Sequence, residues 1–207
     1  YVYAIVSDGD LEEGVSSEAA SLAGTLKLGK LIYLYDDNGI SIEGDTDVAF
    51  TEDVGARFRA YGWHVVGPID GLDTDAIDAA IVEAQRETGR PSLIVAETTI
   101  GYGSPNKAGT GSAHGEPLGE EEVRLTKERL GWPYQEPVTV PPEALAHFRG
   151  ALERGGSRQD EWQRRRKAYR REFPQEARQL EEALSGALPE GWDRELKGLF
   201  APGDKPI

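Results

Sequence analysis

The first half of the chain alternates short apolar runs with segments whose apolar residues recur every three or four positions. The apolar runs predict buried β-strands at residues 1–6, 31–35 and 63–66, with a fourth inside residues 92–100. The intervening segments predict helices. We expect these helices to start at Ser16 or Ser17, within residues 51–53 and at Asp73.

Strands that alternate with helices predict βαβ units and a parallel sheet. Strands that are apolar throughout, rather than at alternate positions, indicate a sheet covered on both faces. The predicted fold is therefore α/β, a parallel sheet with helices on both faces. Right-handed crossovers bring the carboxyl ends of such strands to one edge, where ligands bind. We expect the chemistry in the segments that follow the strands, at residues 8–10, 36–42, 67–71 and 101–119.

The last third of the chain has a different pattern and predicts a helical segment. Residues 137–142 are rich in proline and predict a linker. Helices are predicted at residues 143–153, at 159–184 with an interruption near Pro174, and at 192–200. We therefore divide the chain into an α/β domain at residues 1–136, incomplete at its N-terminal side, and a helical linker segment at residues 137–207.

Composition narrows the range of functions. The 207 residues include 23 basic and 37 acidic ones, a net charge of −14, and residues 1–123 alone carry −16. This acidic excess argues against a nucleic-acid partner. The basic run at residues 164–167 is flanked by acidic residues at helical spacing, which favours an exposed helix with internal ion pairs. No cysteine is present, which excludes thiol nucleophiles and cysteine-based zinc sites.

The ends of the chain and its apolar runs carry further expectations. The runs fall far short of the roughly 20 residues that span a bilayer, so we expect no membrane partner, and without a secretory segment we expect a cytoplasmic protein. The chain begins at Tyr1, inside a predicted buried strand, whereas domain boundaries usually fall in exposed linkers. We therefore expect the chain to be a piece of a larger protein.

Asp8 and Asn38 each follow a predicted strand, and one helical crossover separates them. This topology can bring a carboxylate and an amide oxygen side by side at one edge of the sheet, and such oxygens suit Mg²⁺. Gly9 lets a backbone N–H approach a phosphate closely. The pattern indicates a Mg²⁺-diphosphate site. Ordinary tight turns explain the same residues more often, because Asp-Gly and Asn-Gly are favoured turn dipeptides.

Longer motifs change that balance. Ser7-Asp8-Gly9, followed by Asp37-Asn38 after the next predicted strand, resembles the Gly-Asp-Gly and Asn-Asn signature of thiamine-diphosphate enzymes. Ser7 and Asp37 depart from that signature and leave its metal-binding Asp and Asn in place. Tracts that resemble the transketolase family lie at residues 21–30, 36–42, 57–65, 103–110, 113–119 and 130–132. The resemblance covers essentially the whole chain.

The resemblance implies a site for thiamine diphosphate and a divalent metal. The family's metal ligands match Asp8, the side chain of Asn38 and the carbonyl of Ile40, with Mg²⁺ expected and Ca²⁺ as an alternative. Its diphosphate contacts match the N–H of Gly9 and the amide of Asn38. The cofactor and metal sites would therefore share the carboxyl edge of the sheet.

Four further positions match residues around the family's cofactor. Ile42 and Ile100 fall where aliphatic side chains pack on the thiazolium ring, although isoleucines are more often core residues. Glu13 matches a catalytic glutamate that is buried near the subunit interface and links the two cofactor sites. Read alone, it is a favourable acid in the first turn of a helix. His114 matches a catalytic histidine that contacts both the cofactor and the substrate, a role that suits a residue type titrating near neutral pH. A lone histidine in a glycine-rich loop is more often solvated or structural.

The resemblance implies transketolase activity in the pentose phosphate pathway. This is the transfer of a two-carbon ketol group from a ketose phosphate, such as xylulose 5-phosphate, to an aldose phosphate, such as ribose 5-phosphate. It also implies a homodimer with active sites at the subunit interface, and remaining domains that complete each site, so this chain alone is expected to be inactive. The alternatives are dihydroxyacetone synthase, deoxyxylulose-phosphate synthase, and a non-catalytic metal-diphosphate-binding or regulatory subunit of the same fold.

Overall fold

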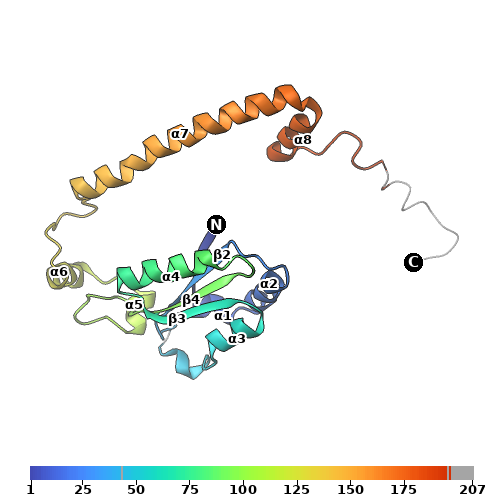
Figure 1. Ribbon diagram of the computed structural model, residues 1–207. Helices are drawn as coiled ribbons and strands as arrows, with labels where there is room; N and C mark the ends of the chain where they lie inside the picture. The colour runs from blue at the N-terminus through green and yellow to red at the C-terminus, as the bar shows by residue number, and fades with distance from the viewer. Residues whose placement is uncertain (43, 195, 197–207) are drawn as a thin grey trace. The chain divides into compact units, whose positions relative to one another are not determined.

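The structure is a computed structural model that describes residues 1–42, 44–194 and 196. The chain separates into two compact units, Tyr1–Pro137 and Val138–Ile207 (Figure 1). The first unit contains a four-stranded sheet, and the described part of the second contains two helices. None of the helices in the described residues is both long enough and apolar enough to cross a membrane.

The sheet is parallel throughout, as predicted. Its strands are β1 (Val2–Ser7), β2 (Leu31–Asp37), β3 (His64–Asp70) and β4 (Ser92–Glu97), and they lie in the order β1-β2-β4-β3. Ser7 pairs with Asp36, and Asp37 and Asp70 both pair with Glu97. The carboxyl ends of all four strands are therefore level at one edge.

Helices cover both faces of the sheet, which confirms the predicted α/β class. Helix α4 (Thr74–Arg86) lies along one face and α3 (Val54–Ala60) along the other (Figure 1). The two faces carry separate cores because successive side chains of a strand point to opposite sides. The core beneath α4 comprises Ile32, Val66, Ala80, Ala84 and Ile94. The opposite core comprises Leu11, Ala20, Ala23, Tyr35, Val54, Phe58, Trp63, Leu93 and Val95.

Two of the three predicted helix starts are correct. The Asp53 side chain accepts a hydrogen bond from the N–H of Ala56 at 2.7 Å, and the Asp73 side chain accepts from the N–H of Asp75 at 2.9 Å. Each carboxylate thus satisfies a backbone donor that the first turn leaves unpaired. The third start is wrong: α2 (Gly14–Thr25) begins before Ser16, whose hydroxyl instead donates to the Glu13 carbonyl at 2.8 Å.

The residues directly after β1 form a helix rather than the tight turn considered above. Helix α1 (Asp8–Glu12) starts at Asp8, and the Asp10 carboxylate accepts from the Ser7 N–H at 2.9 Å and from the Ser7 hydroxyl at 3.0 Å. The strand passes into the helix without a loop because this local bonding caps the first turn. The backbone becomes extended at Glu13, so α1 and α2 are separate helices.

Strand β1 is an edge strand and is not buried as predicted. Its Val2 side chain is 61% exposed and Ile5 is 78% exposed. Only β2 pairs with it in the described part of the chain, and the core residues of α4 pack on β2, β3 and β4. The apolar run therefore predicted the position of the strand correctly but not its exposure.

The segment between β4 and the second unit contains two helices. Helix α5 (Gly111–Gly115) lies inside residues 101–119, which were predicted as one glycine-rich loop. Helix α6 (Glu120–Arg129) follows it and was not predicted. A single-turn 3₁₀ helix, η1 (Thr46–Val48), lies between β2 and α3.

The second unit contains a longer helix than predicted. Helix α7 (Pro142–Glu172) runs without a break through Gly155 and Gly156, so the predicted interruption between residues 153 and 159 is wrong. Each glycine costs only about 1 kcal/mol in a helix, and helical residues extend on both sides. The interruption at Pro174 is correct, because proline lacks the N–H that continues a helix, and α8 (Pro174–Ser185) starts there. The predicted helix at 192–200 falls largely outside the described residues.

Candidate cofactor and metal site

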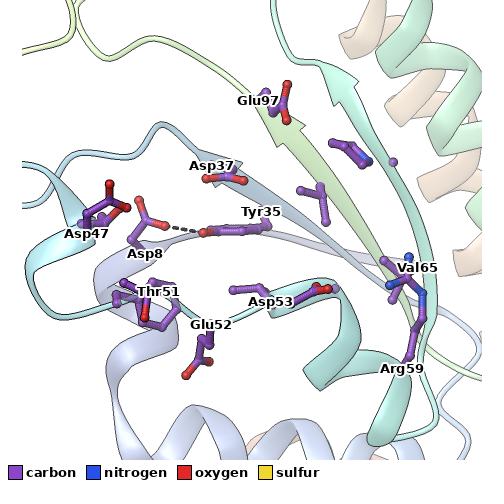
Figure 2. A pocket seen from close by; sticks show the side chains of 17 residues that line it. Asp8, Tyr35, Asp37, Asp47, Thr51, Glu52, Asp53, Arg59, Val65 and Glu97 are labelled. Carbon is purple, nitrogen blue, oxygen red and sulfur yellow. Dashed lines mark hydrogen bonds between the residues drawn. The ribbon is translucent and has the colours of Figure 1, made fainter.

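The candidate site lies at the carboxyl edge of the sheet. Asp8 follows β1 directly and Asn38 follows β2 directly, and the pairing of Ser7 with Asp36 puts these two positions on neighbouring strand ends. In Figure 2, Asp8, Tyr35 and Asp37 converge on the same space. The structure thus brings together the two residues that the sequence singled out.

Asp8 is a buried carboxylate with one oxygen unpaired. The residue is 2% exposed, and its Oδ1 accepts a hydrogen bond from the Tyr35 hydroxyl (Figure 2). Its Oδ2 is buried and has no hydrogen-bond partner in the described part of the chain. Burial raises the pKa of Asp8, the Tyr35 hydrogen bond opposes the shift, and the charge of Asp36 adds to it. A bound cation would satisfy this oxygen and remove the cost of burying it.

Tyr35 holds Asp8 from the core side and was missed by the sequence reasoning. It is 3% exposed, and burial, followed by the hydrogen bond to Asp8, raises its pKa. The phenol therefore stays protonated and acts as a donor at neutral pH. Its position in an apolar strand indicated only core packing, because the hydrogen bond to Asp8 depends on the tertiary structure.

Asn38 and Ile40 carry further oxygen atoms in the turn that follows β2, the strand that neighbours β1. The Asn38 Oδ1 accepts from the N–H of Ile40 at 3.0 Å, and its Nδ2 donates to Asp36 at 3.2 Å, which fixes the side chain in a turn. Ile40 forms an antiparallel bridge with Asp45 through the bonds of the residues on either side. In such a bridge the Ile40 carbonyl points away from its partner segment, so this oxygen stays available.

Gly9 leaves open space above α1. A Cβ built on Gly9 would meet no atom within 4 Å, and its backbone does not adopt the left-handed conformation that favours glycine. Neither packing nor backbone geometry within the described chain therefore requires glycine here. A ligand that approaches the backbone closely would require it.

The two isoleucines lie after neighbouring strands. Ile42 follows β2 and is 68% exposed, which excludes a core role within this chain. Ile100 follows β4 and is half-buried. An isoleucine with this much exposure is suited to covering an apolar group from another molecule.

Glu13 and His114 both lie at the surface of the first unit. Glu13 is exposed at the junction of α1 and α2, and its backbone carbonyl accepts from the N–H of Ser16 at 3.0 Å. His114 is exposed within α5. Neither side chain takes part in the cluster around Asp8, Tyr35 and Asp37.

A polar cavity of about 430 Å³ opens beside Asp8. Acidic side chains from Asp8, Asp37, Asp47, Glu52, Asp53 and Glu97 line it together with Arg59 (Figure 2). Burial raises the pKa of Asp37, as do the charges of Asp8 and Glu97. This field favours a cation and repels a free phosphate, so a diphosphate would need a metal ion to bind here.

The donor set decides which metal chemistry is reasonable. No group of three or more His, Cys, Asp or Glu side chains in the described residues could hold a metal ion by itself. One carboxylate, one amide oxygen and one carbonyl are hard ligands that suit Mg²⁺ or Ca²⁺, with the remaining positions completed by water and phosphate oxygens. The residues therefore fit a metal that binds together with a diphosphate.

The fold and this edge define a class of protein, a parallel α/β domain suited to binding a metal-diphosphate group at the carboxyl ends of its strands. A family model described as the thiamine diphosphate-binding domain of transketolase matches residues 1–189. The chain therefore belongs to the transketolase thiamine diphosphate-binding domain family.

Similar proteins agree in sequence and in structure. A transketolase from Nostoc sp. is 52% identical over 208 residues, covering 100% of this chain and 31% of the relative. Transketolase 1 of Escherichia coli is 48% identical, covering 97% of this chain and 30% of the relative. A transketolase structure from Pichia stipitis in complex with sedoheptulose-7-phosphate has a TM-score of 0.85 and 45% identity, covering 94% of this chain and 29% of that one. The chain thus spans about a third of the length of these relatives.

Proposed function

We propose that this chain forms the metal- and diphosphate-binding part of a transketolase. The complete enzyme would transfer a two-carbon ketol group from a ketose phosphate to an aldose phosphate in the pentose phosphate pathway. The observation that carries the proposal is the Oδ2 of Asp8, which is buried and without a partner among the described residues. Asp8 and the Asn38 turn follow neighbouring strands at the sheet edge. Relatives named transketolase, about half identical over the whole chain, support the same reaction.

Each residue of the site has a proposed role. Asp8, the Asn38 side chain and the Ile40 carbonyl hold the metal, for which we propose Mg²⁺, with Ca²⁺ as an alternative. The Gly9 N–H and the Asn38 amide bind the diphosphate, and Ile42 and Ile100 cover the thiazolium ring. The bound cofactor supplies the covalent chemistry. These residues position the cofactor and balance part of the metal charge. One carboxylate does not neutralise a divalent ion, so the diphosphate supplies the remaining negative charge.

His114 and Glu13 have proposed roles that depend on the remaining parts of the enzyme. His114 would bind substrate hydroxyls and move a proton to or from them, which its exposure in α5 allows. Glu13 would lie at the interface of a homodimer whose active sites are shared between subunits. Its exposure on this unit leaves it accessible to a partner subunit.

The domain assignment belongs to the same proposal. Residues 1–136 would form the diphosphate-binding domain, and residues 137–207 would lead toward a further domain. The relatives are about three times longer than this chain, which supports the existence of further domains. The cytoplasmic location suggested by the sequence stays a prediction.

The test is ketol transfer by the complete enzyme. With thiamine diphosphate and Mg²⁺ present, xylulose 5-phosphate and ribose 5-phosphate should give sedoheptulose 7-phosphate and glyceraldehyde 3-phosphate. Residues 1–207 alone should give no product. A complete enzyme that prefers formaldehyde to ribose 5-phosphate as the acceptor would favour dihydroxyacetone synthase. One that joins pyruvate to glyceraldehyde 3-phosphate would favour deoxyxylulose-phosphate synthase. Cofactor binding without any transfer would favour the regulatory subunit.

A further inference from the structure

One buried carboxylate organises the segment that carries His114. Glu122 lies in the first turn of α6 and is 8% exposed. Its carboxylate accepts hydrogen bonds from the Ser104 hydroxyl, from the Asn106 N–H at 2.8 Å and from the Asn106 Nδ2 at 2.8 Å. Ser104 is fully buried. The Glu122 carboxylate thus accepts hydrogen bonds from three donors, all of which belong to the segment between β4 and α5.

The hydrogen bonds continue from this carboxylate to α5. The Ser104 hydroxyl accepts from the N–H of Lys107 at 3.0 Å, and the Lys107 carbonyl accepts from the Thr110 hydroxyl at 2.7 Å. That hydroxyl lies 2.9 Å from the Ser112 hydroxyl, in the first turn of the helix that contains His114. The connection from Glu122 to the helix is therefore continuous.

Two further bonds hold the flanks of α5. The Lys107 ammonium donates to the Pro117 carbonyl at 3.1 Å, beyond the end of the helix. The Gly109 N–H donates to the Ile100 carbonyl at 2.9 Å, just after β4. The segment is thus tied to the sheet edge on one side and to α6 through Glu122 on the other.

The chemistry of the donors favours an ionised carboxylate at this position. The Ser104 hydroxyl and the two Asn106 donors hold the pKa of Glu122 down to about 2. Glu122 is therefore charged throughout the neutral range, and its direct partners are neutral groups of the segment. A glutamine has the same shape, but its amide nitrogen can only donate, so it would face one of these donors without accepting from it.

We propose that Glu122 is a positioning residue that sets the place of His114 at the active site through Ser104, Lys107 and Thr110. The inference rests on the proposed function, because that function gives His114 its role in ketol transfer. Glu122 itself is too buried to touch substrate. Its influence on the reaction passes through the segment that it holds.

The first test is Glu122→Gln in the complete enzyme, with Glu121→Gln as the matched control. Glu121 is the preceding residue, is exposed and pairs with Arg124. We expect kcat per folded active site to fall about 10- to 100-fold, because misplacement of a catalytic group by an ångström has an effect of this size. The Kd for thiamine diphosphate with Mg²⁺ should stay close to that of the parent. Unchanged kcat with only a lower Tm would reduce Glu122 to a stabilising residue and overturn the proposal.

The second test is amide hydrogen exchange, which does not depend on activity. In Glu122→Gln, exchange within residues 104–114 should accelerate about tenfold or more, since hydrogen bonds to charged groups are the stronger kind, while exchange in α4 stays the same. Unaltered exchange in residues 104–114 overturns the proposal whatever the turnover. A parent enzyme without ketol transfer overturns the proposed function instead, and the exchange still shows whether Glu122 holds the segment.

Ser104→Ala provides a second variant in case Glu122→Gln does not fold. It removes the hydroxyl that links Glu122 to Lys107 and leaves the buried carboxylate with both Asn106 donors. The proposal expects a smaller loss of kcat, with the same faster exchange in residues 107–114. Ser104→Ala with parental kcat and parental exchange would show that the connection does not position His114.

Discussion

The Tyr35 hydroxyl donates a hydrogen bond to one carboxylate oxygen of Asp8, and the other oxygen is left buried without a partner in the described chain. The two residues come from different elements, β2 and α1, that meet at the carboxyl edge of the sheet. Tyr35 therefore fixes the carboxylate from the core, and the unpaired oxygen is where we propose that a cation binds.

Tyr35→Phe should weaken metal binding. Groups that hold a metal ligand in place typically contribute about 10- to 100-fold in affinity, so we expect the Mg²⁺ concentration needed for thiamine diphosphate binding to rise by that factor. Calorimetric titration of the complete enzyme measures it. Tyr33→Phe is the control, because Tyr33 lies on the same strand and packs against the same core. Equal Mg²⁺ requirements in the two variants would contradict the role of Tyr35.

Gly9→Ala and Gly24→Ala should have opposite effects. A Cβ at Gly9 meets no protein atom, so the fold should keep its Tm while affinity for thiamine diphosphate falls at least about tenfold through loss of the close backbone approach. A Cβ at Gly24 would lie 1.8 Å from the Tyr61 carbonyl oxygen. Relieving that overlap should cost about 1–3 kcal/mol of unfolding free energy. Urea denaturation and cofactor titration of both variants check the pair. A large stability loss in Gly9→Ala would show that the fold itself requires glycine at this position.

Ile42→Ala should separate binding from stability in the same way. Ile42 is 68% exposed, and surface substitutions usually change unfolding free energy by no more than about 0.5 kcal/mol. Cofactor affinity should nevertheless fall, because an aliphatic cover is lost. Ile32 is fully buried in the core beneath α4, and Ile32→Ala should cost about 2–5 kcal/mol. Parental cofactor affinity in Ile42→Ala would remove it from the site.

Glu122 should give the first unit a specific acid sensitivity. The folded-state pKa of about 2 lies below the ordinary value of 4.5, so the unfolded chain binds this proton first. The stabilisation by Glu122 is then complete above about pH 4.5 and is lost as the pH falls toward 2. Denaturation of the parent and of Glu122→Gln between pH 2 and 7 should show stabilities that converge at the acidic end. A difference that stays constant across this range would contradict the assignment.

The pattern of apolar residues predicted the parallel sheet because continuous runs such as residues 31–35 are typical of strands covered on both faces. It failed where a competing local or tertiary effect decided the outcome. The Asp10 carboxylate caps a helix where the sequence is typical of a turn, and Gly155 and Gly156 are tolerated inside α7.

The candidate site was predicted only in part, because some of its residues depend on tertiary contacts. Asp8 and Asn38 could be found because strand order along the chain brings their positions to one edge. Tyr35 and Glu122 could not, since each owes its importance to a partner that lies far away in the sequence. A tyrosine in an apolar strand and a glutamate in an acidic helix start are typical of ordinary core and surface positions.

The central claim is that Asp8 holds the metal through which the diphosphate binds. Its most direct test is calorimetric titration of thiamine diphosphate into the complete enzyme and its Asp8→Asn variant, with and without Mg²⁺. We predict that the parent binds the cofactor only with Mg²⁺ and that Asp8→Asn weakens this binding by more than about 100-fold, a larger effect than that of residues that merely support a ligand. The cofactor-free variant should keep or gain thermal stability, because the substitution removes a buried charge with an unpaired oxygen in the described chain. Mg²⁺-dependent binding of parental strength in Asp8→Asn would contradict the claim.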